Sequence, residues 1–328
     1  MKIAVDAMGG DHAPQEIVKG AILASELFPE IEKIFLVGSP TAIEPLLEKR
    51  NDKLEIVPAS EVITMEDHPG IAFRRKKDAS ITVAAKLVKS GEACALVSAG
   101  STGAQMVASL FTLGRIKGIE RPAIAIVLPT LEGGKLLLDA GANADCKVHN
   151  LIDFAKMGNI YAKKILGIEN PRIGLINIGS EATKGNELSI KAFEELSKIN
   201  NINFIGNIEG RDIPQGKCDV FVCDGFVGNV ILKLMEGMAK AFGTILKEEA
   251  NKSIRTKAGA ALMLPALKGI KNRMDYAEYG GAPLLGVDGI SIICHGSSKA
   301  KAIANAIRVA GECYSQGFIN ALKQVSEV

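Results

Sequence analysis

Two glycine-rich loops of the sequence contain residue types that proteins use to hold phosphate. The first is VSAGSTGA at residues 97–104, where an apolar run leads through glycine and hydroxyl residues into a helical pattern that begins near Thr102. Backbone N–H groups at the start of a helix attract anions, and the hydroxyls of Ser101 and Thr102 lie next to the amide of Gly103. We therefore expect Ser101, Thr102 and Gly103 to bind phosphate. The alternative is an ordinary capped strand-to-helix turn, because many such turns look alike.

The second loop adds a positive charge. In IGSEATKGNE, residues 178–187, an apolar run ends in glycine and Lys184 lies between Thr183 and Gly185. An ammonium group in this position can form charge-assisted hydrogen bonds with an anion. We expect Ser180 and Lys184 to bind phosphate, and Lys184 also to stabilise charge in a transition state. The alternative is a solvated surface lysine.

Three further glycine-rich loops are present, at residues 7–14, 223–229 and 279–289. Glycine lets a ligand approach the backbone closely, so we expect these loops to converge on the same site. His12 could serve as acid, base or anion donor, or it could cap a helix. Asp224 and Asn229 are candidates for orienting a substrate.

Several other chemistries have no support in the sequence. The spacings GxxxxGK[ST] and GxGxxG are absent, which excludes a P-loop and a dinucleotide fingerprint. The zinc patterns CxxC and HExxH are also absent, and His295 beside Cys294 lacks zinc-ligand spacing. A GxSxG nucleophile elbow is missing as well. We therefore expect neither a metal nor a cofactor.

The elements that position these loops alternate along the chain. Short apolar runs rich in β-branched residues end in Gly, Ser, Asn or Asp: KIAVDAMGG, KIFLVGS, CALVSAGS, RIGLINIGS, DVFVCDG and ISIICHGS. Continuously apolar strands are buried on both faces, and amphipathic segments such as 79–90 and 102–113 separate them. The pattern predicts a three-layer α/β fold with a mostly parallel, Rossmann-like sheet. Ligands of such folds bind at the carboxyl ends of the strands.

The pattern changes between Phe226 and Asp275, where helical periodicity continues without a convincing strand. The sequence contains no fixed-period repeat and no Pro- or Ser-rich linker. We therefore predict a single α/β domain over residues 1–328 with a helical projection at about 230–275.

Composition excludes other classes of protein. Lys plus Arg number 39 and Asp plus Glu 37, so the whole molecule has no field strong enough to bind nucleic acid nonspecifically. The six cysteines are scattered and are expected to be reduced, which points to the cytosol. The first ten residues lack the apolar stretch of a signal peptide.

Two local patches could nevertheless bind a charged partner. Residues 250–274 contain six basic residues and no acid, around the apolar run AGAALMLPAL at 258–267. Such a segment could lie on a membrane surface or an acidic protein; the alternative is a dimer-interface helix pair. RRKK at residues 74–77 could dock an acidic partner or be a solvated face. The docking candidates are Arg74, Arg75, Lys76, Lys257, Leu262, Leu264, Lys268, Lys271 and Arg273.

Seven segments occur in an order typical of one family: MKIAVDAMGGDHAP, SAGSTGA, DAGANADC, GSEATKGNE, CDGFVGNVILK, YGGAPLLGVDG and HGSS. They extend from residue 1 to residue 298 and so cover nearly the whole chain. Together they closely resemble the bacterial phosphate acyltransferases of phospholipid synthesis, the acyl carrier protein:phosphate transacylases.

The resemblance implies a fold like that of the isopropylmalate dehydrogenase and phosphotransacetylase group. It implies a cytoplasmic homodimer that associates peripherally with the membrane. The implied reaction transfers a fatty acyl group from acyl carrier protein to inorganic phosphate, and the acyl phosphate then serves glycerol 3-phosphate acylation. The implied partners are acyl carrier protein, inorganic phosphate, a second copy of the chain, the membrane surface and the glycerol 3-phosphate acyltransferase.

The residues are compatible with this reaction. Inorganic phosphate is an anion at neutral pH, so the protein has to hold it and to stabilise charge on the thioester oxygen. Glycine loops and Lys184 supply such groups, and no nucleophilic side chain is required. Basic patches would suit an acidic carrier protein. The alternatives are a short-chain phosphotransacetylase that uses acyl-coenzyme A and a noncatalytic scaffold that binds acyl carrier protein and membrane; a dehydrogenase is a weaker rival because the dinucleotide fingerprint is missing.

Overall fold

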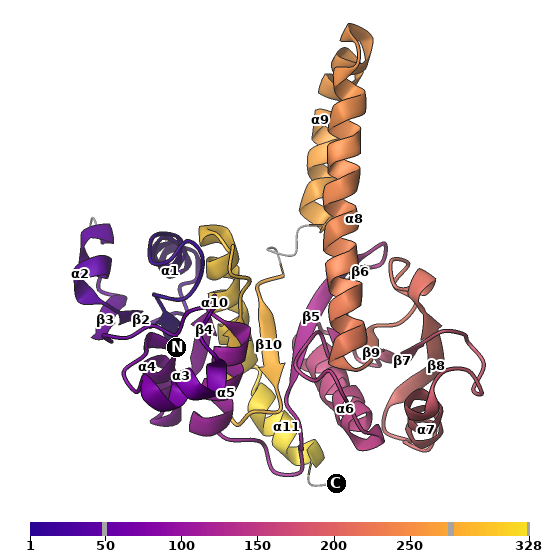
Figure 1. Cartoon of the computed structure of the whole chain (residues 1–328), viewed down its shortest axis with the longest axis horizontal. Helices are drawn as coiled ribbons and strands as arrows, with labels where there is room; N and C mark the ends of the chain where they lie inside the picture. Colours follow the sequence, from indigo (N-terminus) through magenta and orange to yellow (C-terminus); the bar gives the residue numbers. More distant parts are fainter. Residues whose placement is uncertain (48–50, 275–278, 327–328) are drawn as a thin grey trace.

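The computed structural model describes residues 1–47, 51–274 and 279–326. The strands of this part of the chain form one eleven-stranded sheet (Figure 1). In the order in which they lie side by side, they are β3 (Leu54–Pro58), β2 (Lys33–Gly38), β1 (Lys2–Asp6), β4 (Ala95–Ser98), β11 (Ile290–Ile293), β10 (Ala282–Leu285), β5 (Ala123–Thr130), β6 (Gly133–Leu138), β9 (Val220–Val222), β7 (Arg172–Asn177) and β8 (Asn203–Glu209).

The sheet consists of two parallel blocks that run in opposite directions. Strands β3, β2, β1, β4 and β11 are parallel to one another, and so are β6, β9, β7 and β8. Between the blocks, β10 is antiparallel to both β11 and β5, and β5 is antiparallel to β6. The carboxyl ends of the first block therefore lie at one side of the sheet, here called the first rim. Those of the second block lie at the opposite side, the second rim.

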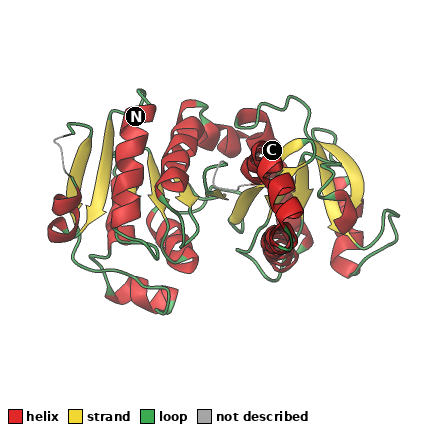
Figure 2. Cartoon of the chain, turned by 90° about the horizontal axis from the view of Figure 1, so that it is seen from above, coloured by secondary structure: helices red, strands yellow, loops and turns green. Residues whose placement is uncertain are grey.

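Helices cover both faces of the sheet (Figure 2). Ile3 and Val5 of β1 belong to one apolar cluster with residues of α1 and α10, whereas Ala4 packs in another with Ala84 of α4. This alternation shows that β1 is buried on both faces. The helices are α1 (Gln15–Leu27), α2 (Pro40–Ile43), α3 (Pro69–Arg75), α4 (Ser80–Lys89), α5 (Thr102–Thr112), α6 (Val148–Lys164), α7 (Glu187–Leu196), α8 (Gly225–Asn251), α9 (Ile254–Met274), α10 (Ala300–Ser315) and α11 (Phe318–Ser326), with short 3-10 turns at Glu44–Leu46 and Gly210–Asp212.

The predicted three-layer α/β fold with a mostly parallel sheet is confirmed. The six predicted strands correspond to β1, β2, β4, β7, β9 and β11. The prediction missed the two outermost strands, whose residues are partly exposed and therefore not continuously apolar. It also missed β5, β6 and β10, the strands at which the direction reverses. The β5–β6 hairpin turns at Gly133, whose φ of 93° is a conformation that glycine tolerates.

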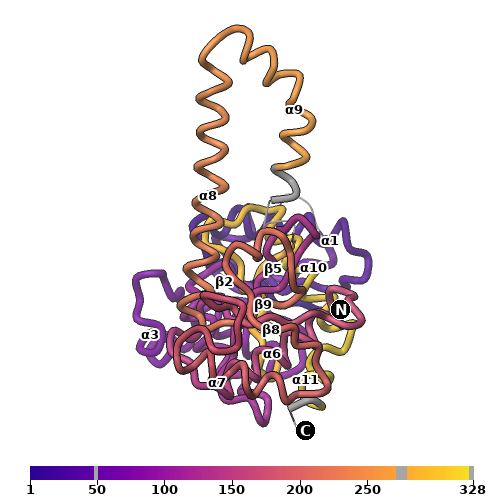
Figure 3. The backbone as a smooth tube through the Cα atoms, turned by 90° about the vertical axis from the view of Figure 1, so that its right-hand side faces the viewer, coloured from indigo at the N-terminus to yellow at the C-terminus, as the bar shows by residue number. Residues whose placement is uncertain are grey.

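The helical projection is formed by α8 and α9, which extend away from the sheet as an antiparallel pair (Figure 3). With 27 residues, α8 is roughly 40 Å long, far longer than the strands that it follows. Its first turns pack on the sheet through Val227, Ile231 and Met235. Farther out, apolar side chains such as Phe242 and Leu262 are exposed, at 63% and 85%.

A buried ion-pair network ties the amino ends of β6, β9 and β7 together. Lys135 Nζ lies 2.7 Å from Asp219 Oδ1, and Arg172 Nε lies 3.0 Å from Asp219 Oδ2. Burial alone would raise the pKa of Asp219, but hydrogen bonds from Arg172 and Lys135 outweigh it and lower the pKa to about 2. The carboxylate is therefore more stable in the folded chain than in the unfolded one.

We expect this network to make stability depend on pH in the acid range. A lowered pKa in the folded state gives stability that is present above about pH 4 and is lost as the pH falls toward about 2. Urea unfolding should show a smaller loss between about pH 5 and about pH 3 for Asp219→Asn than for the parent protein. Glu26→Gln, at an exposed position on α1, is the control. Identical pH dependence in the parent and Asp219→Asn would contradict this role.

Candidate functional site

The reversal of strand direction separates the loops that the sequence suggested would meet. Residues 7–14 and 97–104 follow β1 and β4 at the first rim, whereas 178–187 and 223–229 follow β7 and β9 at the second rim. The segment 279–289 reaches both rims, because β10 lies inside it. The expected convergence of all five loops is therefore wrong within one chain. Apolar strand patterns do not reveal strand direction, which is why the sequence did not show it.

The distance across the sheet also separates the two groups of loops. Six strand positions separate β4 from β7, which corresponds to roughly 29 Å at the usual strand spacing. Figure 1 shows the two strands on opposite sides of the molecule. Ser101, Thr102 and Gly103 therefore cannot hold the same phosphate as Ser180 and Lys184 of the same chain.

Three loops do meet at the first rim, after β1, β4 and β11. A Cβ on Gly9 would come within 2.8 Å of the Gly100 amide nitrogen, and one on Gly10 within 3.2 Å of the Gly296 carbonyl oxygen. The Asp11 amide donates a hydrogen bond to that carbonyl at 2.8 Å. These close contacts define the first-rim cluster, formed by residues 8–12, 98–103 and 294–298.

Asp6, the last residue of β1, connects the loops of this cluster through hydrogen bonds. Its carboxylate is 2% exposed and accepts hydrogen bonds from the Ser98 hydroxyl at 2.7 Å and from the Met8 amide at 3.3 Å. The Ser98 hydroxyl oxygen in turn accepts a bond from the Gly100 amide at 3.0 Å. Burial raises the pKa of Asp6, while the hydrogen bonds, including one from Ser80, oppose the shift. The sequence analysis missed Asp6, although an acid that ends an otherwise apolar strand could have indicated it.

The start of α5 presents the groups that could bind an anion. Ser101 is the N-cap, and its side chain accepts a hydrogen bond from the Ala104 amide at 3.4 Å. The amides of Thr102 and Gly103 belong to the first helical turn, where N–H groups have no partner within the helix. The Thr102 side chain is exposed. This arrangement suits phosphate, with Ser101 partly committed to capping.

Two histidines flank the same cluster. His12 is exposed, and its carbonyl accepts a hydrogen bond from the Glu16 amide as α1 begins. The Nδ1 atom of His295 lies 2.8 Å from the Ser297 hydroxyl and accepts from the Ser297 amide at 3.2 Å. Because the Asp11 amide is bonded to the Gly296 carbonyl, the loops of His12 and His295 are neighbours, which sequence spacing alone did not show.

The second rim is built around another buried carboxylate, Asp139. One oxygen accepts from the amides of Ile124, Gly141 and Ala142, and the other accepts from the backbone and side-chain nitrogens of Asn143. Burial raises the pKa of Asp139, and these hydrogen bonds oppose the shift. The carboxylate therefore fixes the conformation of the loop after β6, and its oxygens have little remaining capacity to accept hydrogen bonds from a ligand.

Asp224 and Asn229 lie next to this carboxylate. Asp224 is the N-cap of α8 and accepts a hydrogen bond from the Val227 amide at 2.8 Å. Asn229 is exposed and lies beside Gly141. Helix capping explains the position of Asp224. The negative charges of Asp224 and Asp139 make this place unfavourable for an anion.

Lys184 lies in a separate, well-ordered loop at the second rim. Its carbonyl accepts a hydrogen bond from the Asn177 side chain, and the Glu181 carbonyl accepts one from the Asn207 side chain, both at 2.9 Å. The side chains of Ser180 and Lys184 are exposed. The loop could hold an anion, but one distinct from an anion at the start of α5.

The docking candidates occupy two distant places. Arg74 and Arg75 end α3 with exposed side chains, whereas Lys76 is engaged by Asp67 at 2.5 Å and by the Val62 carbonyl. Lys76 is therefore less suited to docking than predicted. On α9, exposed side chains are found at Lys257, Leu262, Leu264 and Lys268. The side chains of Lys271 and Arg273 lie outside the described part of the chain.

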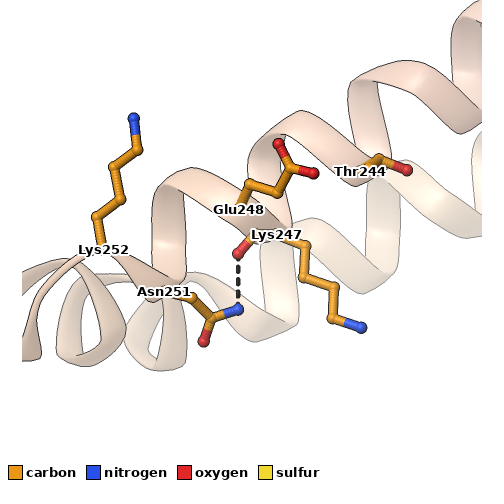
Figure 4. A pocket seen from close by; sticks show the side chains of 5 residues that line it. All are labelled: Thr244, Lys247, Glu248, Asn251 and Lys252. Carbon is orange, nitrogen blue, oxygen red and sulfur yellow. Dashed lines mark hydrogen bonds between the residues drawn. The ribbon is translucent and has the colours of Figure 1, made fainter.

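A hollow at the outer end of α8 is not connected with either rim. It is formed by Thr244, Lys247, Glu248, Asn251 and Lys252, and the Asn251 side chain donates to the Lys247 carbonyl at 2.8 Å (Figure 4). Its residues belong to a single helix surface. We assign it no role in the chemistry.

Cysteine chemistry is disfavoured at both rims. The six cysteines are free and are buried or half-buried. Burial raises the pKa of Cys146 and of Cys294 to about 12, so both thiols are neutral at physiological pH. Within residues 1–47, 51–274 and 279–326, no group of three or more His, Cys, Asp or Glu side chains is arranged to hold a metal ion.

Solved structures that are similar to this chain show its fold group. A phosphotransacetylase from Streptococcus pyogenes superposes with a TM-score of 0.62 at 16% identity, covering 99% of this chain and 94% of that one. A branched-chain phosphotransacylase from Enterococcus faecalis gives 0.61 at 16% identity, covering 94% and 98%. A 4-hydroxythreonine-4-phosphate dehydrogenase from Klebsiella pneumoniae gives 0.52 at 13% identity, covering 94% and 96%. The chain thus has the fold of the phosphotransacetylase and dehydrogenase group, as the resemblance implied.

Sequence comparison narrows the class to one family. The model of a family described as "Fatty acid synthesis protein" matches residues 1–321. A protein named phosphate acyltransferase from Heliobacterium modesticaldum is 62% identical, covering 99% of this chain and 97% of its own length. One with the same name from Desulfitobacterium hafniense is 60% identical with the same coverage. The chain belongs to this family of phosphate acyltransferases and is an acyltransferase.

The separation of the two candidate anion-binding loops predicts independent effects on activity. Thr102→Val should raise the KM for phosphate about tenfold, since it removes one hydrogen bond to a charged group. Lys184→Ala should lower kcat/KM by less than about a hundredfold. Removing a group that stabilises a transition state costs roughly a hundredfold or more. In the double variant the two fold-changes should multiply.

Initial rates over a range of phosphate concentrations give the KM for phosphate and the kcat/KM of each variant. Lys164→Ala, at an exposed lysine on α6, serves as the control. Strong coupling between positions 102 and 184 would show that the two loops share an ion across two copies of the chain. It would contradict the conclusion that an anion at the start of α5 is distinct from one at the Lys184 loop.

Proposed function

We propose that this acyltransferase transfers a fatty acyl group from acyl carrier protein to inorganic phosphate. The acyl phosphate then serves the acylation of glycerol 3-phosphate in phospholipid synthesis. The observation that carries the proposal is the first-rim cluster. It combines the first-turn amides of Thr102 and Gly103, which the helix itself leaves without partners, with the exposed side chain of Thr102, and an arginine pair lies on the neighbouring helix α3.

The proposed step needs no covalent intermediate with the protein. Phosphate held at the start of α5 attacks the thioester carbonyl, and the carrier thiol leaves as the acyl–oxygen bond is completed. The helix dipole and the first-turn amides would hold the phosphate, and negative charge on the carbonyl oxygen would be met by donors of the same cluster. His12 or His295, on two neighbouring loops of the same cluster, would give the thiol its proton.

The arginine pair suits an acidic carrier protein. Arg74 and Arg75 form no ion pair within the part of the chain that the structure describes, and both side chains are exposed. The start of α3 touches the start of α5, because the position of a Cβ on Gly103 would be 2.7 Å from Pro69 Cγ. A carrier docked on α3 would therefore deliver its thioester next to the proposed phosphate site.

A short-chain phosphotransacetylase reaction is the second candidate. The observation that favours it is the likeness in fold to a phosphotransacetylase. The noncatalytic scaffold considered above is set aside, because the chain belongs to a family of acyltransferases.

The direct test is phosphate-dependent loss of thioester. We expect purified protein to deplete palmitoyl–acyl carrier protein only when phosphate is added, with acyl phosphate trapped as a hydroxamate. The rate should exceed that with acetyl-coenzyme A by at least tenfold. A faster reaction with acetyl-coenzyme A would favour the second candidate, and thioester loss without phosphate would exclude both.

We further propose that the protein is a cytoplasmic homodimer that touches the membrane through α9, where it would pass acyl phosphate to the glycerol 3-phosphate acyltransferase. Within the described residues, no helix combines the length and apolarity needed to cross a bilayer. Leu262 and Leu264 are 85% and 52% exposed, with Lys257 and Lys268 nearby in sequence. An apolar surface flanked by positive charge suits an anionic lipid surface.

Leu262→Glu combined with Leu264→Glu should abolish flotation with anionic vesicles. The change removes apolar insertion and adds negative charge, while raised salt should weaken binding of the parent, since each basic group contributes on the order of 1 kcal/mol. Leu27→Glu, at an exposed leucine on α1, is the matched control. Gel filtration and soluble turnover of the same preparation should remain unchanged. If the variant were monomeric, this segment would belong to the subunit interface. If it floated as well as the parent, the membrane role would be ruled out.

A further inference from the structure

We propose that Gln105 is a positioning residue for the reaction: it fixes the start of α5, where phosphate would bind, relative to the loop that carries His295. Its side chain is fully buried, so it acts by holding α5 against β11 and not by touching a substrate. The inference rests on the proposed function and deepens it, because it names a group that sets the geometry of the proposed phosphate site.

The side-chain amide of Gln105 links α5 with β11. Gln105 is 0% exposed, and its Nε2 donates hydrogen bonds to the Ser291 hydroxyl oxygen and to the Ile292 carbonyl oxygen, both at 2.9 Å. A carbonyl oxygen only accepts, so the amide nitrogen must be the atom that faces it. One turn farther along α5, the Ser109 hydroxyl donates to the Ser291 hydroxyl at 3.1 Å. The helix is therefore attached to this strand at two successive turns.

This link lies close to the first-rim cluster in both segments that it joins. On α5, Thr102 precedes Gln105 by three residues, which corresponds to about 4.5 Å along the helix axis. In the other segment, His295 follows Ile292 by three residues, just after β11 ends. A shift of α5 relative to β11 would therefore change the distance between the first-turn amides and His295.

The start of α5 has a second attachment on its other side. The hydrogen bonds that connect Asp6, Ser98 and Gly100 fix the loop before the helix. Gln105 fixes the helix itself, one turn after its first residue. The first-turn amides lie between these two attachments, so both determine where the amides point. Loss of the link to β11 would leave the amides free to move relative to the loops that flank them.

Packing alone does not explain an amide at this position. Among the described residues, the buried Oε1 atom of Gln105 has no hydrogen-bond partner. A buried amide oxygen without a partner destabilises the folded state, and an apolar side chain of similar size would avoid this cost. The amide therefore contributes directional bonds to β11 at the expense of stability. Such a residue should affect function and stability in opposite directions.

Gln105→Met tests the inference, because it keeps the length of the side chain and removes both hydrogen bonds. We expect the KM for phosphate to rise at least fivefold, since hydrogen bonds to an anion weaken when the donors are misaligned. The KM for palmitoyl–acyl carrier protein should stay within twofold of the parent value. The free energy of unfolding in urea should equal or exceed that of the parent.

Two further variants define the comparison. Asn159→Leu on α6 is the matched control: Asn159 is 8% exposed, and its Oδ1 also has no partner in the described part of the chain. It should leave both KM values within twofold. Ser291→Ala tests the same link from β11 and should raise the KM for phosphate about twofold, because the bond to the Ile292 carbonyl remains. Its effect should shrink in the Gln105→Met background.

The contrary outcomes are distinct. An unchanged KM for phosphate in Gln105→Met, or an equal rise in Asn159→Leu, would overturn the inference. So would a loss of stability with a raised KM for both substrates, which indicates a general loss of structure. If Gln105→Met does not fold, an unchanged KM for phosphate in Ser291→Ala would overturn it. A parent protein without phosphate-dependent thioester loss would instead refute the proposed function.

Discussion

The reversal of strand direction at the centre of the sheet governs the rest of this structure. Because β10 and β5 each run antiparallel to both neighbours, the two parallel blocks present their strand ends at opposite rims. Each rim therefore collects its own set of glycine-rich loops. One set surrounds the start of α5, and the other surrounds the start of α8, so a single chain contains two polar centres.

Both centres are organised by the same physical device. An aspartate at or just after the end of a strand is buried and accepts several hydrogen bonds. At the first rim Asp6 accepts from Met8 in the following loop and from Ser98 at the end of β4, and at the second rim Asp139 accepts from the loop that follows it. A buried carboxylate is costly unless several donors surround it, so the loop is held in the one conformation that supplies them. The two centres differ in charge at the start of the helix. The start of α5 is capped by the Ser101 hydroxyl, whereas the start of α8 is capped by the Asp224 carboxylate and lies beside the carboxylate of Asp139.

Much of the fold was predictable from sequence, because continuously apolar runs and amphipathic segments report burial directly. The strands β1, β4 and β11 and the helices α4 and α5 were predicted for this reason. The pairing that sets strand direction was not, since it depends on contacts between residues far apart in the chain. The same limit explains why Ser101 and Thr102 were grouped with Lys184: each loop has anion-binding chemistry, but loop chemistry carries no information on distance. Asp6 and His295 were undervalued because their importance comes from the neighbours that folding brings to them.

The attachment of α8 has a consequence for how the family can vary. A side chain at Gly228 would overlap the Asp139 carbonyl, and one at Gly225 would lie 2.8 Å from the Asn143 backbone, so the root of the projection tolerates no substitution. By contrast, Gly237, Gly243, Gly259 and Gly269 have nothing within 4 Å of the position of an added Cβ. The outer part of the projection therefore has room for larger side chains at these four glycines, whereas its base at Gly225 and Gly228 has none. Substitutions there can change what the far end touches without disturbing the loops from which the helix starts.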